Sequence, residues 1–410
     1  MTSSYAGFKP RQRPATSGRE PTEQTLGRLK GYAEAAEAAV AEPFRGITAD
    51  GAVVPGLFPL QETGVSTRSI ADAAAAFLVS LGADSSVARF PIESDVWRRW
   101  SNIHPYVMRH GAALDAMNAA QRERALALLR ESLSAMGFET SQNIMRLNET
   151  IRELTGKDEE YGEWLYWLSI MGAPPADGAN AEGAPWGWQI DGHHLIINCL
   201  IAGDQVVMTP VFMGSEPVIA EGGKYAGTRV FEAEERSGLT LMRSLSAEQR
   251  DTAILSAELP SEVFTTAFRD NFELRYEGIR WGELSSAQQG LLLALIETYV
   301  GRIRPGHAEV KLAEVKQHLE ETHFAWMGGF SEGPLPPDGR DDESVFYYRV
   351  HSPVILIEFD HESGIALDND APSRNHIHTV VRTPNGNDYG KDLLRQHHEQ
   401  FAHSSGLEST

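Results

Sequence analysis

Two histidines near the carboxyl end of the chain have the spacing of a metal-binding pair. His376 and His378 lie two residues apart in RNHIHTVVRT, a stretch whose β-branched residues predict a strand. Alternate side chains of a strand point to the same face, so both imidazoles should face one way. Neutral imidazole binds Zn, Fe and Cu, and the pair therefore predicts a site for a divalent transition metal. Arg382 follows on the same predicted face, and we include it among the candidate catalytic residues.

A second pair of histidines occurs in PWGWQIDGHHLIIN, residues 185–198. If His193 and His194 begin a strand, the alternation of side chains lets only one of them face the site. We predict that His194 does so, because Asn198 adds a polar side chain to the same face. A β-bulge at Gly192 would instead turn both rings inward. The predicted histidine ligands of the metal are therefore His194, His376 and His378.

A carboxylate lies on an otherwise apolar strand in ILIEFDHE. Glu358 shares a predicted strand face with Val354 and Leu356. A buried acid needs a cation or a metal as its partner, so we predict Glu358 as the fourth metal ligand or as a general base. The alternative is an acid on an edge strand in contact with water.

Aromatic residues accompany both stretches. Trp186 and Trp188 are separated by one residue and should point the same way, so they are predicted to wall a substrate pocket above the histidines. Asn198 and Tyr347 are predicted substrate contacts. The alternative is that the two tryptophans belong to a packed turn of the core.

Composition excludes several classes of function. The chain of 410 residues has a formal net charge of −21, which opposes binding to nucleic acid and to anionic membranes. It contains one cysteine and no phosphate-loop or dinucleotide-binding pattern. We find no long apolar run and no secretory signal, so we expect a cytoplasmic protein whose partner is a small molecule.

The order of the predicted elements indicates an α+β fold, with a helical amino-terminal part and then a mainly antiparallel sheet with inserted helices. We predict a disordered leader over 1–21, a mainly helical region over 22–175, a β-rich region with the site over 176–400, and a tail over 401–410. Polar residues with Gln three positions later predict capping boxes at the starts of three helices. These polar residues are Asn118, Ser246 and Ser286.

Several phrases taken together resemble those of the uncharacterised domain-of-unknown-function family 3500, which is found in bacteria and fungi. They are PWGWQIDGHHLIIN, TPVFMGSEPV, FAWMGG, YYRVHSPVILIEFD and NHIHTVVRTPNGNDYG, and the resemblance covers roughly residues 60–400. It implies that these stretches belong to one domain, but it brings no activity with it.

Three functions are compatible with these residues. The first is a metal-dependent hydrolase that activates water at the histidine-bound metal. The second is an iron or copper oxidoreductase with the same ligands. The third is a metal-free protein that binds a small molecule in an aromatic pocket. We favour hydrolysis, because the sequence contains no motif for a redox cofactor.

Overall fold

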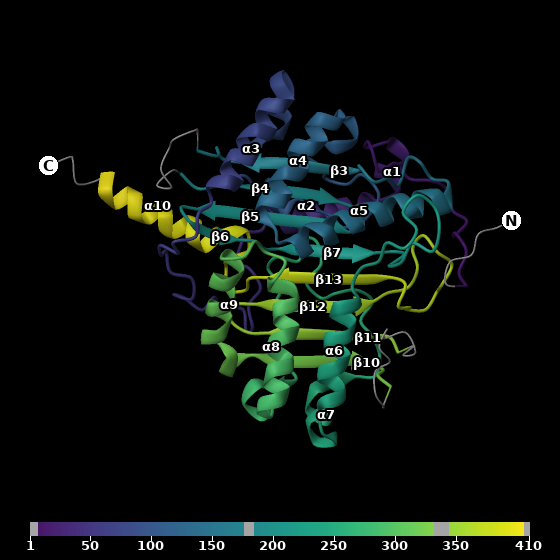
Figure 1. Ribbon diagram of the computed structural model, residues 1–410, viewed down its shortest axis with the longest axis vertical. Helices are drawn as coiled ribbons and strands as arrows, with labels where there is room; N and C mark the ends of the chain where they lie inside the picture. Colours follow the sequence, from purple (N-terminus) through teal and green to yellow (C-terminus); the bar gives the residue numbers. More distant parts are fainter. Residues whose placement is uncertain (1–6, 176–183, 332–343, 406–410) are drawn as a thin grey trace.

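The computed structural model describes residues 7–175, 184–331 and 344–405, and its centre is one large mixed sheet (Figure 1). The strand order is β1-β3-β4-β5-β7-β13-β12-β11-β10-β8. The short strands β2, β6 and β9 pair with β3, β5 and β10, respectively. All pairings are antiparallel except β1 with β3 and β8 with β10. The predicted α+β class is confirmed.

The strands of the central part have these bounds: β3 Tyr166–Met171, β4 Trp186–Gly192, β5 Leu195–Ala202, β6 Gln205–Val207, β7 Val211–Ser215, β10 His323–Gly328, β11 Phe346–His351, β12 Leu356–His361 and β13 Ile377–Arg382. The short strands are β1 Arg89–Phe90, β2 Ala112–Ala113, β8 Ile254–Ser256 and β9 Ile279–Arg280. The helices are α1 Glu23–Arg28, α2 Lys30–Ala41, α3 Arg68–Leu81, α4 Ala119–Ser132, α5 Ala135–Thr155, α6 Glu232–Ser244, α7 Ala247–Ala253, α8 Ser286–Val300, α9 His307–Gln317 and α10 Lys391–Ser405.

One face of the sheet is apolar and is covered by helices. Figure 1 shows α4, α5, α6 and α8 lying across this face. Ile197 of β5 and Val350 of β11 belong to a single core with Leu128, Ile144 and Leu292 from three of these helices. Strand alternation explains why every second residue of the central strands contributes to this core.

The opposite face carries many buried polar side chains and is covered largely by irregular chain. Here Ile196 and Phe212 pack against Trp97 and Trp100. Trp97 belongs to the 3₁₀ helix Asp95–Arg98, and Trp100 follows this helix. The segment between β8 and β9 covers the same face further along, and its Val263 lies in the same cluster. The candidate site lies at one end of this polar face.

Residues 7–21 differ from the predicted disordered leader. The guanidinium of Arg11 donates hydrogen bonds to the carbonyls of Leu367 and Gly364. Arg13 forms a 2.7 Å ion pair with Glu160. This segment is therefore held against loops that are distant in sequence, which the composition of the segment did not reveal.

The apolar stretch Arg68–Ala88 is long and apolar enough to cross a membrane by length and composition. This stretch differs from the expectation that the chain has no long apolar run. Here it forms α3 and a 3₁₀ helix that begins at Gly82, and Ile70, Ala74 and Phe77 of α3 lie in the core.

The predicted capping boxes are confirmed at two of the three helices. Asn118 with Gln121 and Ser246 with Gln249 form capping boxes, as predicted. The third box is one residue earlier than predicted, since Ser285 is the N-cap of α8 and pairs with Gln288.

The predicted boundary near residue 175 does not divide the sheet, because β3 pairs with β4 across it. The predicted tail is partly helical, since α10 runs to Ser405, and residues 406–410 lie outside the described part of the chain.

Candidate metal centre

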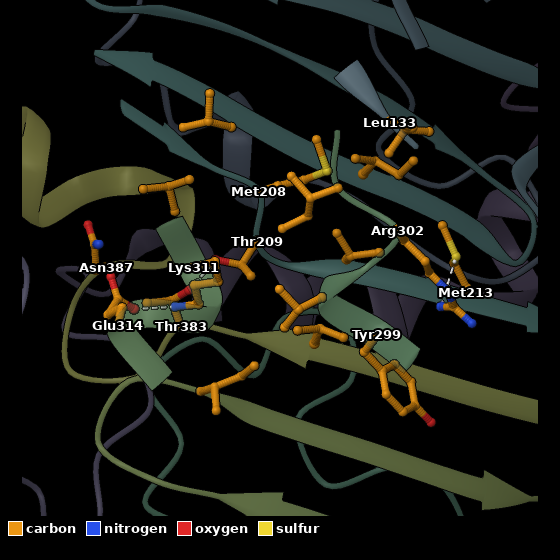
Figure 2. Close-up of a pocket in the computed structure, with 18 residues that line it drawn as sticks. Leu133, Met208, Thr209, Met213, Tyr299, Arg302, Lys311, Glu314, Thr383 and Asn387 are labelled. Carbon is orange, nitrogen blue, oxygen red and sulfur yellow. Dashed lines mark hydrogen bonds and ion pairs between the residues drawn. The ribbon is translucent and has the colours of Figure 1, made fainter. Parts of the chain in front are cut away.

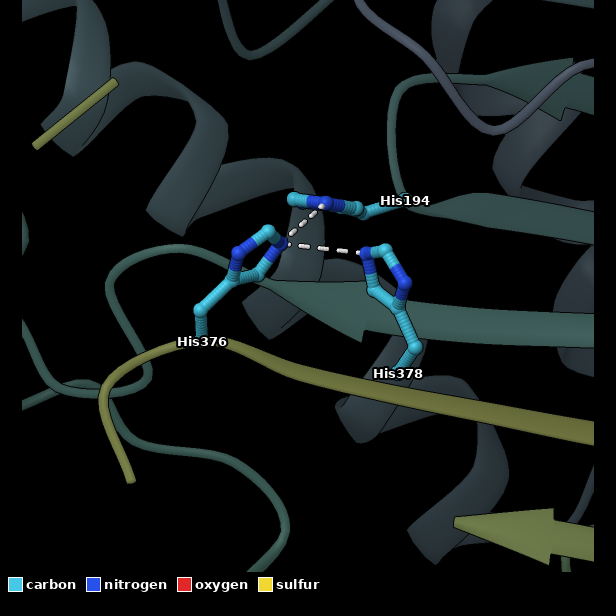
Figure 3. A group of neighbouring side chains, drawn as sticks. All are labelled: His194, His376 and His378. Atoms are coloured by element: carbon cyan, nitrogen blue, oxygen red, sulfur yellow. Dashed lines mark hydrogen bonds between the residues drawn. The ribbon is translucent and has the colours of Figure 1, made fainter. Parts of the chain in front are cut away.

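Three imidazoles from two segments of the chain, the β4–β5 turn and the start of β13, converge at one end of the polar face (Figure 3). The Nε2 atom of His376 lies 3.4 Å from Nε2 of His194 and 3.1 Å from Nε2 of His378. All three residues are buried, with exposed fractions of 6%, 1% and 6% for His194, His376 and His378. Nitrogens this close together, in a buried place, form a ligand set that can hold one metal ion.

The sheet topology brings these residues together. His194 directly precedes β5, His376 directly precedes β13, and His378 is the second residue of β13. Strand β7 lies between β5 and β13, and its Gly214 pairs with His378. The missing side chain of Gly214 leaves room for two of the rings, because a Cβ there would lie 2.7 Å from Cδ2 of His378 and 3.1 Å from Cδ2 of His194.

His194 occupies a turn and not a strand. His193 and His194 form the two-residue connection between β4 and β5, and His194 has a φ of 62°. The left-handed region is uncommon for residues other than glycine and is concentrated at functional sites. The expectation that His194 joins the other histidines agrees with the structure. The strand-parity argument behind that expectation was wrong, because the pair precedes β5 and no bulge is needed.

His193 lies beside the cluster but takes a different partner. Its ring stacks on that of His194 with 3.9 Å between the centroids, and its Nδ1 lies 2.8 Å from Oδ1 of Asn148. Burial, followed by the neighbouring imidazoles, lowers the pKa of His194 well below its usual range. The uncharged form of the ring, which is the form that binds metals, is therefore favoured.

The Nδ1 atoms of the other two histidines are already engaged. Nδ1 of His376 lies 2.7 Å from the carbonyl oxygen of Ser363, and Nδ1 of His378 lies 2.6 Å from Oε1 of Glu362. For His376, the carbonyl partner assigns the proton to Nδ1, so the lone pair on Nε2 points into the group. The Nδ1 atom of His378 lies close to Glu362 without a well-aligned hydrogen bond, since Oε1 of Glu362 has no hydrogen-bond partner among the described residues.

Residues 63–391 match the family described as protein of unknown function (DUF3500). The chain belongs to the DUF3500 family. No curated protein and no solved structure shows a significant similarity to it. The assignment confirms the resemblance found in the sequence, and it places all three histidines inside the matched region.

Glu358 does not lie among the ligand atoms of the DUF3500 histidine cluster. Its carboxylate accepts hydrogen bonds from the backbone N–H groups of Phe264 and Thr265, at 2.8 and 2.9 Å, and from the Thr265 hydroxyl. Tyr347, predicted to contact substrate, donates its hydroxyl to the same carboxylate at 2.8 Å. The buried carboxylate is satisfied by hydrogen bonds from Phe264, Thr265 and Tyr347. Its predicted roles as metal ligand and general base are therefore corrected.

Arg382 has a similar anchoring role. It is fully buried and forms ion pairs with Asp270 and Asp388, and it also donates to the carbonyls of Thr265 and Thr266. Its donors are therefore used to hold the segment that also binds Glu358. Four residues along a strand span about 13 Å, which separates Arg382 from His378. The predicted catalytic role of Arg382 is not supported by this geometry.

The predicted substrate contacts of the first stretch are also structural. Trp186 and Trp188 point the same way, as expected, but into the helix-covered core, with exposed fractions of 3% and 0%. Asn198 donates to the carbonyl of Pro210 and accepts from Gln189, so its amide is used inside the sheet. These three residues do not form a pocket at the histidines.

Sequence reasoning missed two acids at the cluster. Asp360 pairs with His378 across the two strands, and Glu362 directly follows β12. Oxygens of both acids and a nitrogen of His378 lie within 4.8 Å of one another. The two-residue period that selected Glu358 would also have selected Asp360 and Glu362, so the signal was present in the sequence.

Two adjoining cavities lie elsewhere in the DUF3500 chain. The first has about 60 Å³ and is lined by residues such as Met208, Met213 and Val381, together with Arg302, Lys311 and Glu314 (Figure 2). The second is more open, has about 330 Å³ and shares Lys311 and Glu314 with the first. The first is smaller than the roughly 300 Å³ of most small-molecule sites, and neither is lined by any of the three histidines. We therefore base the functional argument on the histidines.

Proposed function

We propose that this protein is a metal-dependent enzyme that holds a divalent transition metal at His194, His376 and His378 and uses it to hydrolyse a small organic substrate. The observation that supports the proposal is the convergence of three buried Nε2 atoms, with those of His194 and His378 lying 3.4 and 3.1 Å from that of His376. Catalytic zinc sites typically have three protein ligands and an open position, whereas structural sites have four.

The kind of ligand favours hydrolysis over oxygen chemistry. Oxygenases with non-haem iron commonly use two histidines and one carboxylate as direct ligands. Here the three convergent atoms are all imidazole nitrogens, and the carboxylate of Glu362 contacts His378 on its other nitrogen. A divalent ion bound in this way would lower the pKa of a coordinated water molecule to near neutrality.

The protein's own residues would orient the ligands and exclude bulk water. The carbonyl of Ser363 holds the ring of His376 in place through its Nδ1 atom, and the carboxylate of Glu362 lies 2.6 Å from Nδ1 of His378. The loop that follows Glu362 returns to His376, since the N–H of Glu362 donates to the His376 carbonyl. Residues 7–21 pack on the same loop, since Arg11 donates to the carbonyls of Gly364 and Leu367. The burial of all three histidines favours a small substrate.

The proposal is tested first by elemental analysis of the purified full chain. At least about one equivalent of a transition metal should be present or bind after reconstitution. His194→Ala, His376→Ala and His378→Ala should each lose it. The matched control is His351→Ala, since His351 is 1% exposed on β11 of the same sheet but lies outside the cluster.

Activity is then measured on a panel of small esters, amides and phosphoesters, with and without a chelator. Hydrolysis that depends on the metal and is lost in the three histidine variants is the expected result. Full metal content in these variants would overturn the assignment of ligands. A reproducible copper or iron content with oxygen consumption would favour the oxidoreductase instead.

A further inference from the structure

Two acids beside the histidines lie where a second ion could bind. We propose that Asp360, Glu362 and His378 hold a second divalent cation next to the three-histidine site. Their ligand atoms lie within 4.8 Å of one another, and all three side chains are buried or nearly so. The proposal deepens the proposed function and rests on it, because a second ion serves that chemistry only beside the first.

Asp360 is the observation that points to a cation. The residue is fully buried, and neither of its carboxylate oxygens accepts a hydrogen bond from the described part of the chain. An ionised carboxylate without a partner is strongly disfavoured away from water. The orphaned oxygens are therefore explained if an ion occupies the space in front of them.

Glu358 provides an internal comparison on the same strand. It lies two residues before Asp360, so both carboxylates lie on the same face of β12. Glu358 is as deeply buried as Asp360, but it accepts two backbone N–H groups and two hydroxyls. The described residues thus satisfy one buried acid completely and offer no hydrogen-bond donor to its neighbour.

Among the described residues, no side-chain cation forms an ion pair with Asp360. Arg349 of β11 pairs with Glu277, and Arg382 of β13 pairs with Asp270 and Asp388. The charged side chains nearest to it along the strand are further acids, since Glu358 lies two residues before Asp360 and Glu362 two residues after it. A divalent ion would remove this repulsion and would keep the carboxylates ionised.

The donor set indicates the class of ion. Carboxylate oxygens combined with one imidazole suit Mn²⁺, Fe²⁺ and Zn²⁺. The Nδ1 atom of His378 is the one that faces Glu362, at 2.6 Å, while its Nε2 faces His376. The second ion would therefore replace the Nδ1 proton, which would leave to solvent, and His378 would present one nitrogen to each ion.

The test is metal stoichiometry of the full chain. The protein is stripped with a chelator, loaded with Zn²⁺, desalted and analysed for zinc and protein. The wild type should bind about two equivalents, and Asp360→Asn and Glu362→Gln should each bind about one. His194→Ala should also bind about one, because it loses only the first site, whereas His378→Ala should lose most of both.

Glu358→Gln is the matched control, since it removes an equally buried acid of the same strand without touching the proposed ligands. It should keep both ions, and thermal melting of each variant checks that it folds. If the wild type binds one ion and Asp360→Asn is identical to it, this inference fails while the proposed function stands. If the wild type binds none, both fail. If Asp360→Asn and His194→Ala each lose both ions, the two sites are not separate and the inference is overturned.

Discussion

Replacing Gly214 by alanine tests whether the space between the imidazoles matters for metal binding. The added Cβ would lie 2.7 Å from Cδ2 of His378, 2.8 Å from the carbonyl oxygen of Ile377 and 3.1 Å from Cδ2 of His194. Ordinary contacts begin near 3.4 Å, so the ring of His378 would have to move by about 0.7 Å and that of His194 by about 0.3 Å. Ligand distances in metal sites tolerate about 0.2 Å, so both shifts exceed what a bound ion accepts.

We expect Gly214→Ala to weaken metal binding by about tenfold or more, the scale seen when the support of a ligand is disturbed. Overpacking should also lower the free energy of unfolding by about 1–3 kcal/mol. Affinity is measured by competition with a chelator of known strength, and stability by urea unfolding of the metal-free protein.

Gly187→Ala is the control for overpacking alone. Its Cβ would lie 2.3 Å from the carbonyl oxygen of Cys199 and 2.7 Å from the ring of Trp97, in the same sheet but away from the histidines. It should lose a similar amount of stability and keep the affinity for metal. Wild-type affinity in Gly214→Ala, or an equal loss of affinity in Gly187→Ala, would refute the reasoning.

Three further predictions concern residues around the site. Glu358→Ala removes the acceptor of four hydrogen bonds and leaves buried donors unpaired. The free energy of unfolding should therefore fall by about 3 kcal/mol or more, while the metal content stays unchanged. Loss of metal without loss of stability would show that Glu358 is a ligand. Trp188→Ala should cost about 3–5 kcal/mol of stability, measured by urea unfolding, with the metal retained, since the ring is fully buried in the core. Burial lowers the pKa of His104 from 6.5 to about 3. Below pH 6.5, His104 therefore binds a proton in the unfolded chain but stays uncharged in the folded chain. The stability linked to His104 should thus be complete above pH 6.5 and should fall on acidification, by up to about 1.4 kcal/mol per pH unit, and His104→Asn should show a shallower slope between pH 6.5 and 5 in urea unfolding.

The features that were predicted correctly depend on short stretches of chain. The capping boxes at Asn118 and Ser246 are closed by a residue three positions away, so the sequence contains the whole interaction. Both rings of the pair His376 and His378 point into one group, although His376 directly precedes the strand. The error of one residue at Ser285 arose because neighbouring serines offer the same local chemistry.

Local sequence patterns could not predict the hydrogen-bond partners of the buried polar groups. Glu358, Asp360 and Glu362 are equivalent by strand period, and alternation alone cannot rank them. Thr265 satisfies Glu358 from 93 residues away, and no comparable donor reaches Asp360 among the described residues. The choice of Glu358 therefore failed for a physical reason, since a carboxylate binds whichever donors the tertiary fold places nearest.

The sequence by itself determined the types of element, the α+β class and the histidine pair, because these follow from periodicity and residue chemistry. Only the tertiary structure decided that His194 meets His376, 182 residues away, because that contact depends on β7 lying between β5 and β13. The same long-range pairing turned the two tryptophans into core residues. Strand order follows from how all the buried faces pack together, and no short stretch of sequence contains that information.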